Sequence, residues 1–393
     1  MILYFVIKNE YLTKVKVIQI KTLSCTIMEQ NCLNLQDQSF INLALNLSYK
    51  NIGITSGNPS VACVLVKNDV IISTGITGEG GIPHAENIAI LKADKNVSGS
   101  TAYVTLEPCS HFGKTPPCVD LIIKSKISRV VIVTIDPDER VDGLGIKKLR
   151  AAGIQVVVGG ATEKARKINQ GFFSSKIKGR PYITLKLATS FNGKIADKNS
   201  DNQWISSLKS REYAHYLRLK NDAILVGSGT LINDDPTLNC RLSGLEKYSP
   251  SRIILSSNLD FNTEKKVFQG AKSIPTYIAT NNPDNKKFTD LGVKIINFKE
   301  GNLKYFARQL PKIGINNLLV EGGSIVAGEF LKAGLIDKFI WIKSAKIIIE
   351  GTDAISGFDI NKFSQNKNFK ITKTRKIDED FVTYFESEEN SIL

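Results

Sequence analysis

The chain has 393 residues, of which 42% are hydrophobic and 23% charged, and its formal net charge is +14. This length predicts two globular domains, and the absence of any apolar run near the roughly 20 residues of a membrane span excludes an integral membrane protein. The lysines are scattered rather than clustered. We therefore interpret the charge as solvated surface that suits small anionic substrates better than nucleic acid.

The chain contains too few cysteines, and too irregularly spaced, for a disulfide framework, which predicts a reducing cytoplasm. They are Cys25, Cys32, Cys63, Cys109, Cys118 and Cys240. Charged residues interrupt the apolar N-terminal segment, and no small-residue cleavage site follows it. We interpret residues 1–28 as an N-terminal extension that results from a start codon assigned upstream of Met28.

Helices and strands alternate along the first half of the chain. Apolar residues at helical spacing predict a helix over 35–49, and a strand, a turn and a strand follow over 61–73. Further elements are a helix at 84–93, a strand at 101–107, a helix at 118–126, a strand at 129–137, a helix at 143–153 and a strand at 154–160. The continuous apolar strands predict an α/β/α arrangement whose sheet is covered on both faces.

A polar, basic stretch at 174–181 interrupts this pattern and predicts a domain boundary. Beyond it, strands are expected at 182–190, 223–230, 252–257, 276–280, 294–298 and 316–323, separated by helices or loops. The chain therefore divides into an extension (1–28), a first α/β domain (29–175) and a second α/β domain (176–393).

One histidine and two cysteines form the strongest chemical pattern of the sequence. His84 begins a helix, Cys109 follows a strand and a proline, and Cys118 begins the next helix. Two thiolates and one imidazole suit Zn²⁺, and three protein ligands leave a fourth position for water, which is typical of a catalytic site. Glu86 lies two residues after His84, where it can pass a proton from that water to a departing amine.

This order of residues is that of the zinc nucleobase deaminases, whose signature is H-x-E followed by P-C-x-x-C. Here the eight residues SHFGKTPP separate the cysteines where the signature has two. Either the pattern is accidental or the insertion serves a particular substrate. Within it, His111 and Lys114 are suited to hold a phosphate beside the metal, and Gly113 lets the backbone come close.

Segments of both halves closely resemble the bifunctional riboflavin-biosynthesis deaminase/reductase family. In the first half they are NPSVACVLV, HAENIAI, TAYVTLEPCSHFGKTPPCVDLII and IDPD. In the second half they are LKLATSFNGKIA, QWIS, DAILVGSGTLINDDPTLNCR and VEGGSIVAGEFLKAGLIDKFI. The resemblance implies an N-terminal cytidine-deaminase-like α/β/α domain and a C-terminal α/β domain similar to dihydrofolate reductase.

By this resemblance, the first domain hydrolyses the 2-amino group of a diaminopyrimidinone that bears a ribosylamino 5'-phosphate. The resemblance implies zinc ligands at His84, Cys109 and Cys118 and a proton shuttle at Glu86. It also implies deaminase substrate contacts at Asn58, His111 and Lys114.

The second domain, by the same resemblance, reduces the ribosyl group to ribityl with NADPH. A strand, a Gly-Gly turn and a helix at 316–331 can bind phosphate through free N–H groups, although this pattern alone is weak. The implied cofactor contacts are Ala188, Trp204, Thr230, Asp234, Ser257, Gly323, Ser324, Ile325, Val326, Ala327 and Gly328. The implied substrate contacts are Lys186, Asn202, Arg218, Leu238, Arg241 and Glu321.

Among these, we expect Arg218 and Arg241 to bind the 5'-phosphate, Glu321 to bind sugar hydroxyls and Lys186 to orient the sugar. Outside this motif, an arginine is more often part of a surface ion pair.

The chain departs from the family pattern at four positions. Ala62 replaces a glycine, Thr77 a histidine, Phe112 a second loop histidine and Asn192 an acidic residue. We expect metal chemistry and hydride transfer to survive, because the departures affect substrate affinity or geometry.

Two other functions fit part of the pattern. A zinc nucleic-acid deaminase would use the positive charge and bind RNA or DNA in a salt-sensitive way. A non-catalytic, zinc-stabilised protein would close its site with a fourth protein ligand. The long loop and the reductase-like half favour the bifunctional enzyme. For it we expect a phosphorylated pyrimidine substrate, no nucleic-acid or membrane partner, a homo-oligomer and a cytoplasmic location.

Overall fold

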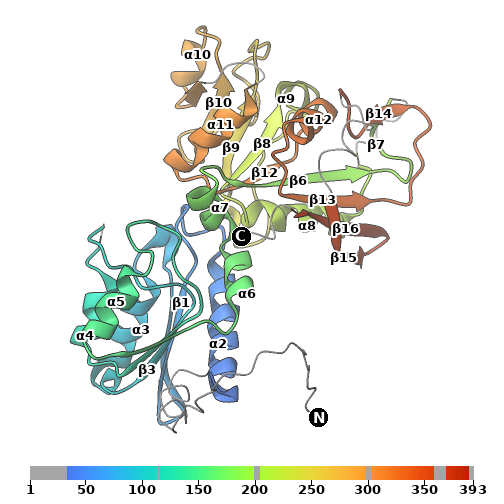
Figure 1. Ribbon diagram of the computed structural model, residues 1–393. Coiled ribbons are helices and arrows are strands. Elements are labelled where there is room, and N and C mark those ends of the chain that lie inside the picture. Colours follow the sequence, from blue (N-terminus) through green and yellow to red (C-terminus); the bar gives the residue numbers. More distant parts are fainter. Residues whose placement is uncertain (1–32, 114, 199–203, 298–301, 358–368, 389–393) are drawn as a thin grey trace, which may run out of the picture.

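The computed structural model describes residues 33–113, 115–198, 204–297, 302–357 and 369–388, so the predicted extension at 1–28 lies outside the described residues. Two α/β units, each with its own sheet, follow each other along the chain (Figure 1). The longest described helix, α2 (Leu35–Ser48), has 14 residues, and no helix in these ranges is long and apolar enough to cross a bilayer.

The first unit is built on a five-stranded sheet with the order β2-β1-β3-β4-β5. Its strands are β1 (Ala62–Lys67), β2 (Val70–Ile76), β3 (Thr101–Val104), β4 (Arg129–Ile132) and β5 (Gln155–Val158). Besides α2, its helices include α3 (Ala85–Ala93), α4 (Cys118–Lys124), α5 (Leu144–Ala151), α6 (Thr162–Ile168) and α7 (Gln170–Ile177). β1 and β2 form the predicted hairpin, while β3, β4 and β5 run parallel.

Alternate residues of β1 belong to two separate cores. Ala62 and Val64 pack in the core beneath α2 and α6, whereas Cys63 and Leu65 pack with residues of α3, α4 and α5. Figure 1 shows α2 and α6 on one face of the sheet and the other three helices on the opposite face. This arrangement confirms the predicted α/β/α layers and explains the continuous apolar runs of the strands.

An ion pair between the partly buried Arg129 and the buried Asp37 carboxylate fastens α2 to the sheet. The helix begins with a capping box, in which Asn34 accepts from the N–H of Asp37 at 2.7 Å and donates its own N–H to the Asp37 carboxylate at 3.0 Å. Arg129 donates two N–H groups to that carboxylate, at 2.7 and 3.0 Å, and the Tyr103 hydroxyl donates at 2.7 Å. Burial raises the pKa of Asp37, but these donors outweigh it and bring the pKa to about 2.

The second unit has a nine-stranded sheet with the order β11-β10-β9-β8-β12-β6-β13-β16-β15. Its strands are β6 (Tyr182–Thr189), β8 (Ala223–Gly227), β9 (Ser251–Leu255), β10 (Thr276–Thr280), β11 (Lys294–Asn297), β12 (Asn317–Val320), β13 (Lys338–Lys343), β15 (Phe369–Ile377) and β16 (Asp380–Ser387). The helices are α8 (Leu208–Leu219), α9 (Ser228–Asp234), α10 (Lys286–Thr289), α11 (Leu303–Gln309) and α12 (Ser324–Lys332). A separate pair consists of β7 (Lys194–Asp197) and β14 (Gly351–Asp353).

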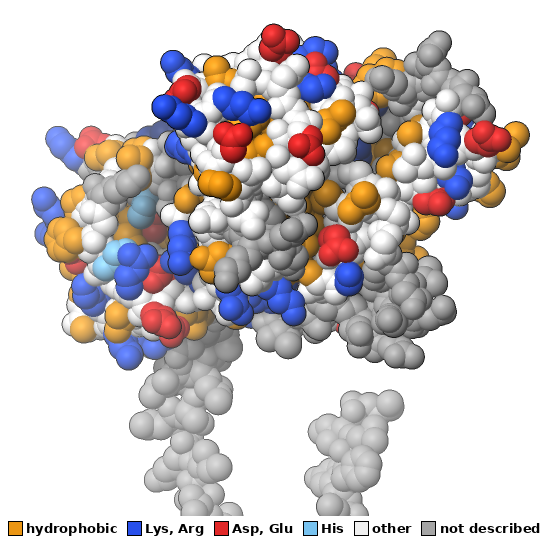
Figure 2. Space-filling model, turned by 90° about the horizontal axis from the view of Figure 1, so that it is seen from above, with side chains coloured by type: hydrophobic (Ala, Val, Ile, Leu, Met, Phe, Trp, Pro, Cys, Tyr) orange, Lys and Arg blue, Asp and Glu red, His pale blue; other side chains and the backbone are white. Residues whose placement is uncertain are grey.

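All strands from β11 to β13 in this order run parallel, so their carboxyl ends lie at one edge of the sheet. The six strands predicted in this half of the chain are among them. In an open parallel sheet, ligands bind at this edge. On the face shown in Figure 2, basic side chains are interspersed with acidic ones, in agreement with the scattered lysines of the sequence.

The predicted domain boundary between residues 175 and 176 falls within α7, which lies between the two sheets (Figure 1). Phe173 of this helix packs in a core of the first unit, whereas Gly171 is so close to Asn317 of β12 that a Cβ would meet its side chain at 2.3 Å. The helix contacts both units, and the position of the boundary stays a prediction.

Candidate zinc centre and reductase site

The three predicted zinc ligands lie at the starts of two helices and in one loop. His84 is the N-cap residue of α3, with φ −68° and ψ 157°, and its side chain makes no capping bond. Cys118 is the first residue of α4, directly after Pro117. Cys109 lies in the loop between β3 and α4. Two helix starts and one loop thus converge on one point.

The three side chains form one cluster. The Nδ1 atom of His84 lies 3.3 Å from the Sγ atom of Cys118 and 3.5 Å from that of Cys109. Tetrahedral zinc sites, with Zn–N near 2.0–2.1 Å and Zn–S near 2.3 Å, separate N and S ligands by about 3.6 Å. The cluster therefore fits a zinc ion. Among the described residues it has three members, which leaves a fourth coordination position open.

The two cysteines of this cluster differ in their proton affinity. A hydrogen bond between the thiols lowers the pKa of Cys109 and raises that of Cys118. The backbone N–H of Cys118 also donates to the Sγ atom of Cys109, at 3.3 Å. A thiolate is thus already stabilised at Cys109, and thiolates are the form in which cysteine binds a metal.

Glu86 faces the same cluster from the first turn of α3. Its side chain is buried, and its carboxylate accepts a hydrogen bond from the Cys118 thiol. Burial, followed by the charge of Cys109, raises the pKa of Glu86 to about 7. A carboxyl group with such a pKa can both accept and donate a proton near neutrality, as a general acid/base must.

Two residues that sequence reasoning missed hold the loop around Cys109. The carboxylate of Glu107, which is 3% exposed, accepts from the N–H groups of Gly143 and Ile146 at 3.0 and 3.2 Å. Lys148 of α5 donates to the carbonyl of Ser110 at 2.8 Å. The position of Glu107 directly before the Pro-Cys pair was the available signal, since a buried acid beside a metal loop needs donors of its own.

The three predicted deaminase substrate residues have different settings. Asn58 has an exposed side chain that packs beside Gly81, three residues before His84. The Nδ1 atom of His111 is buried without a hydrogen-bond partner among the described residues, so it is available to a ligand. Lys114 lies outside the described residues.

Two of the three family departures in this unit, Ala62 and Thr77, occupy structural positions. The Thr77 hydroxyl accepts from the backbone N–H of Val61 at 2.9 Å, and Ala62 is fully buried in β1. Phe112 is 79% exposed. None of the three is a member of the metal cluster.

In the second unit, the structure brings three predicted substrate residues together at the centre of the sheet. Arg218 of α8 donates its Nε and Nη2 groups to the two carboxylate oxygens of Glu321, both at 2.9 Å. The Nζ atom of Lys186 lies 3.8 Å from the same carboxylate. Burial raises the pKa of Glu321, but the charges of Arg218 and Lys186 outweigh it and bring the pKa to about 2. Glu321 is therefore a fixed carboxylate after the end of β12.

Arg241 belongs to a neighbouring network that includes a histidine that sequence reasoning missed. The Nε group of Arg241 donates to Nε2 of His215 at 3.2 Å, and Nδ1 of His215 lies 3.2 Å from the carbonyl oxygen of Asn239. Burial, together with the charges of Arg218 and Arg241, lowers the pKa of His215 to about 4. The neutral imidazole orients Arg241. The available signal was its spacing, three residues before Arg218 on one helix.

Two predicted substrate contacts and one family departure of the second unit remain. Leu238 is 2% exposed and has φ +53°, so only its backbone is able to meet a ligand. Asn202 lies outside the described residues. Asn192, where the family has an acid, donates Nδ2 to the carbonyl of Ile348 at 2.7 Å and accepts from its N–H at 3.1 Å. A carboxylate cannot make the first of these bonds.

The predicted cofactor residues of α12 divide into two groups. Gly323 is the N-cap residue of this helix, and a Cβ there would lie 3.2 Å from the Thr230 hydroxyl. Ile325 is 68% exposed, and Ser324 is half-buried. By contrast, Val326, Ala327 and Gly328 are buried against the core. The free N–H groups at the start of α12, beside Thr230, fit a cofactor phosphate.

The other predicted cofactor residues lie mostly at the carboxyl edge of the sheet. Ala188 is near the end of β6, Ser257 follows β9, and Asp234 ends α9. Trp204 is 52% exposed and stacks against Arg211, whose guanidinium lies 4.3 Å from the ring centre. The edge at which these residues lie is the one expected to bind a nicotinamide nucleotide.

Two known protein families match the two units. Residues 34–134 match the family described as the cytidine and deoxycytidylate deaminase zinc-binding region, and residues 181–383 match the RibD C-terminal domain. The fold and the two sites thus define a bifunctional enzyme, a zinc deaminase joined to a reductase that uses a nicotinamide cofactor. The predicted fold class, with a cytidine-deaminase-like and a dihydrofolate-reductase-like domain, is confirmed.

Similar proteins span nearly the whole chain. The riboflavin biosynthesis protein RibD of Aquifex aeolicus is 40% identical over 351 residues, which cover 89% of this chain and 98% of the relative. RibD of Escherichia coli K12 is 34% identical over 365 residues, or 88% and 98% of the two chains. The chain belongs to the RibD family of riboflavin-biosynthesis proteins.

Solved structures of similar proteins agree with this family assignment. Acinetobacter baumannii RibD has a TM-score of 0.83 and 31% identity, with 90% of this chain and 99% of that chain covered. A diaminohydroxyphosphoribosylaminopyrimidine deaminase/5-amino-6-(5-phosphoribosylamino)uracil reductase of Thermotoga maritima has a TM-score of 0.81 and 35% identity, with the same coverage.

Proposed function

We propose that the chain catalyses two steps of riboflavin biosynthesis. The first unit hydrolyses the 2-amino group of the diaminopyrimidinone ribosylamino 5'-phosphate, and the second reduces the ribosyl group of the product to ribityl with NADPH. The observation that supports this most strongly is the buried Glu86 beside the cluster of His84, Cys109 and Cys118.

In deamination, the oxygen of water forms a bond to the pyrimidine carbon, and the bond to the amino group breaks to release ammonia. His84, Cys109 and Cys118 would hold a zinc ion, which would supply a Lewis acid that lowers the pKa of that water. Glu86 takes the proton from the attacking water and gives it to the departing amine. Asn58 binds the pyrimidine, and His111, with its unpaired Nδ1, binds the substrate near its phosphate.

In reduction, a nicotinamide cofactor held at the start of α12 would supply the hydride for the sugar carbon, and this chemistry belongs to the cofactor. Glu321 binds sugar hydroxyls, and Lys186 beside it orients the sugar. Arg241 binds the 5'-phosphate. The Nε and Nη2 groups of Arg218 both donate to Glu321. This geometry supports a role for Arg218 in orienting that carboxylate more than a role in binding the phosphate.

A mass-resolved product assay with NADPH or NADH tests these assignments. We expect the deaminated product without cofactor and the deaminated, reduced product with NADPH, at a higher rate than with NADH. Return of unchanged substrate from folded, zinc-loaded protein would contradict the assigned substrate. The four cysteines that the structure describes are free thiols, which supports the proposed cytoplasmic location, and the homo-oligomeric state stays a prediction.

A further inference from the structure

The second unit contacts the loop around Asn58 at two glycines of the first unit. We call residues 52–60 the Asn58 loop. Gly53 and Gly57 have φ +89° and +78°, and a Cβ there would lie 1.9 Å from the carbonyl oxygen of Leu219 and 2.4 Å from that of Gly314. Only glycine combines this left-handed conformation with such a close approach. The loop is therefore shaped to pack against the reductase unit.

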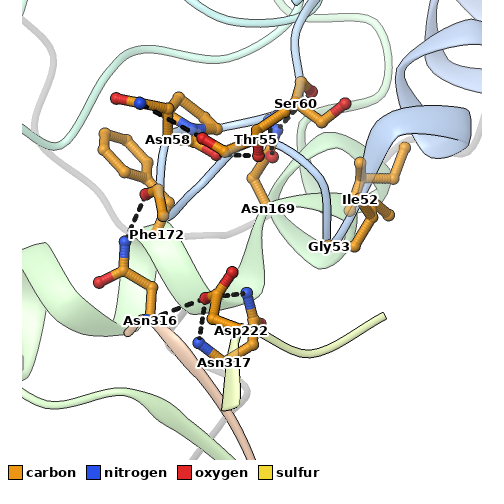
Figure 3. Close-up of a pocket in the computed structure, with 13 residues that line it drawn as sticks. Ile52, Gly53, Thr55, Asn58, Ser60, Asn169, Phe172, Asp222, Asn316 and Asn317 are labelled. Atoms are coloured by element: carbon orange, nitrogen blue, oxygen red, sulfur yellow. Dashed lines mark hydrogen bonds between the residues drawn. The ribbon is translucent and has the colours of Figure 1, made fainter. Parts of the chain in front are cut away.

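Hydrogen bonds from the reductase unit hold the same loop. The Nδ2 group of Asn316, a residue that is 8% exposed, donates to the carbonyl of Gly57 at 2.5 Å. The carboxylate of Asp222 accepts from the backbone N–H groups of Asn316 and Asn317 at 2.9 and 2.7 Å, and also from the backbone of Gly57. Figure 3 shows Asp222, Asn316 and Asn317 on one side of the small pocket, and Thr55 and Asn58 on the other.

The loop in turn fixes Asn58 beside the segment that leads to His84. The Thr55 hydroxyl donates to the carbonyl of Asn58 at 2.6 Å, and Asn58 donates Nδ2 back to the carbonyl of Thr55 at 3.3 Å. A Cβ at Gly81 would lie 2.0 Å from Nδ2 of Asn58, so the amide rests directly on that glycine. Asn58 is thus placed from two sides, by the loop and by this segment.

The far end of the loop is held within the first unit itself. Asn169, between α6 and α7, accepts from the N–H of Ser60 at 2.8 Å and donates to its carbonyl at 3.1 Å. Loss of the contact from Asn316 therefore frees the middle of the loop around Gly57 without releasing its junction with β1.

We propose that Asp222 and Asn316 of the reductase unit are positioning residues for deamination. They fix the Asn58 loop so that the Asn58 side chain meets the pyrimidine, which makes the reductase unit a support for the deaminase binding surface. This inference rests on the proposed function of the first unit.

The variant Asn316→Ala tests the inference, because it removes the bond to Gly57 and leaves the backbone contacts of Asp222 in place. We expect KM for the diaminopyrimidinone to rise roughly fivefold to tenfold, as for one lost hydrogen bond, with kcat changed less than about twofold. Reduction of separately supplied deaminated intermediate should be unchanged. Amide hydrogen exchange should accelerate in residues 52–60 and stay unchanged in α3.

Two controls separate positioning from a general loss of stability. Lys167→Ala removes an exposed ion pair between the two units, 3.9 Å from Glu386, and should leave both activities unchanged. Gly57→Ala should raise KM in the same way as Asn316→Ala. Gly99 has the same left-handed conformation, with φ +76°, but no neighbour lies within 4 Å of a Cβ built there. The control variant Gly99→Ala should therefore leave KM unchanged.

The inference would be overturned if Asn316→Ala and Lys167→Ala had the same KM and the same amide hydrogen exchange in residues 52–60. It would also be overturned if exchange in Asn316→Ala were faster while its KM stayed unchanged. A parallel loss of reduction in Asn316→Ala would assign it a merely structural role and would also overturn the inference. If the unmodified protein does not deaminate, the proposed function fails. Exchange in residues 52–60 then still shows whether Asn316 fixes the loop.

Discussion

Glu86 is 4% exposed, and its carboxylate interacts with both thiols of the cluster. Glu86→Gln keeps the shape of the side chain and removes its ability to transfer a proton. We expect ammonia release to fall by about 10²–10⁴-fold, the usual contribution of general acid/base catalysis. Zinc content by elemental analysis and reduction of the deaminated intermediate should stay unchanged. Full activity of Glu86→Gln would contradict its role. The control is Glu163→Gln, because the Glu163 side chain on α6 is 85% exposed.

Arg218 differs from a surface arginine because its side chain is only 14% exposed and its two bonds to Glu321 are partly buried. Arg218→Lys keeps the charge but loses the two parallel bonds that fix the carboxylate. We expect kcat/KM for reduction to fall by about 10- to 100-fold, since breaking a charge-assisted pair costs about 1.5–3 kcal/mol. Deamination should be unchanged. Arg308→Lys on α11 is the control, and a reduction rate equal to that of this control would refute the role of the pair.

At the residue scale, the sequence was sufficient for groups with a distinctive chemistry and spacing. The cluster of His84, Cys109 and Cys118 was predicted because zinc restricts both the residue types and their order. His215 was missed because its importance depends on Arg241, which lies 26 residues away in the chain and meets it only after folding. The bonds that Asn192 makes to Ile348 are equally invisible in the sequence.

At the scale of elements, the attachment of α2 depends on one buried carboxylate. Asp37→Asn leaves the Arg129 charge without its partner, and we expect the first unit to lose about 3 kcal/mol of unfolding free energy at neutral pH. The folded-state pKa of Asp37, about 2, lies below its ordinary value of 3.8. The stabilisation is therefore complete above pH 3.8 and is lost as pH falls towards 2.

Urea unfolding of Asp37→Asn and the unmodified protein, followed by circular dichroism, measures this dependence. The difference between their midpoints should be constant from pH 7 to about 5 and should shrink below pH 4. A difference that persists unchanged at pH 3 would show that the carboxylate charge is not its source. Asp120→Asn, an exposed position in the first turn of α4, should show a difference of at most about 1 kcal/mol, as expected for a carboxylate at a helix N-terminus.

The strands that the sequence predicts correctly are those whose burial produces a continuous run of apolar residues. β1, β4 and β8 were predicted because both of their faces are covered. By contrast, β15 was missed because it is a charged edge strand with mostly exposed residues, and among the described strands it pairs with β16 alone.

At the scale of the whole molecule, the packing of the two units was beyond sequence reasoning. It depends on contacts such as that of Asn316 with Gly57, which lie 259 residues apart in the chain. The order of the motifs predicts which chemistry each unit performs, but it contains no information on which loops meet. The dependence of the Asn58 loop on the reductase unit emerges only from the folded chain.

The most direct measurement is a mass-resolved product assay of the zinc-loaded and chelator-treated protein, run with and without NADPH. Zinc-loaded protein should give a deaminated product without NADPH and a deaminated, reduced product with it. After chelation, deamination should be lost, while separately supplied deaminated intermediate should still be reduced, and added zinc should restore the first step. Deamination that survives complete zinc removal, or no conversion by zinc-loaded protein, would contradict the assignment of two chemistries to the two units.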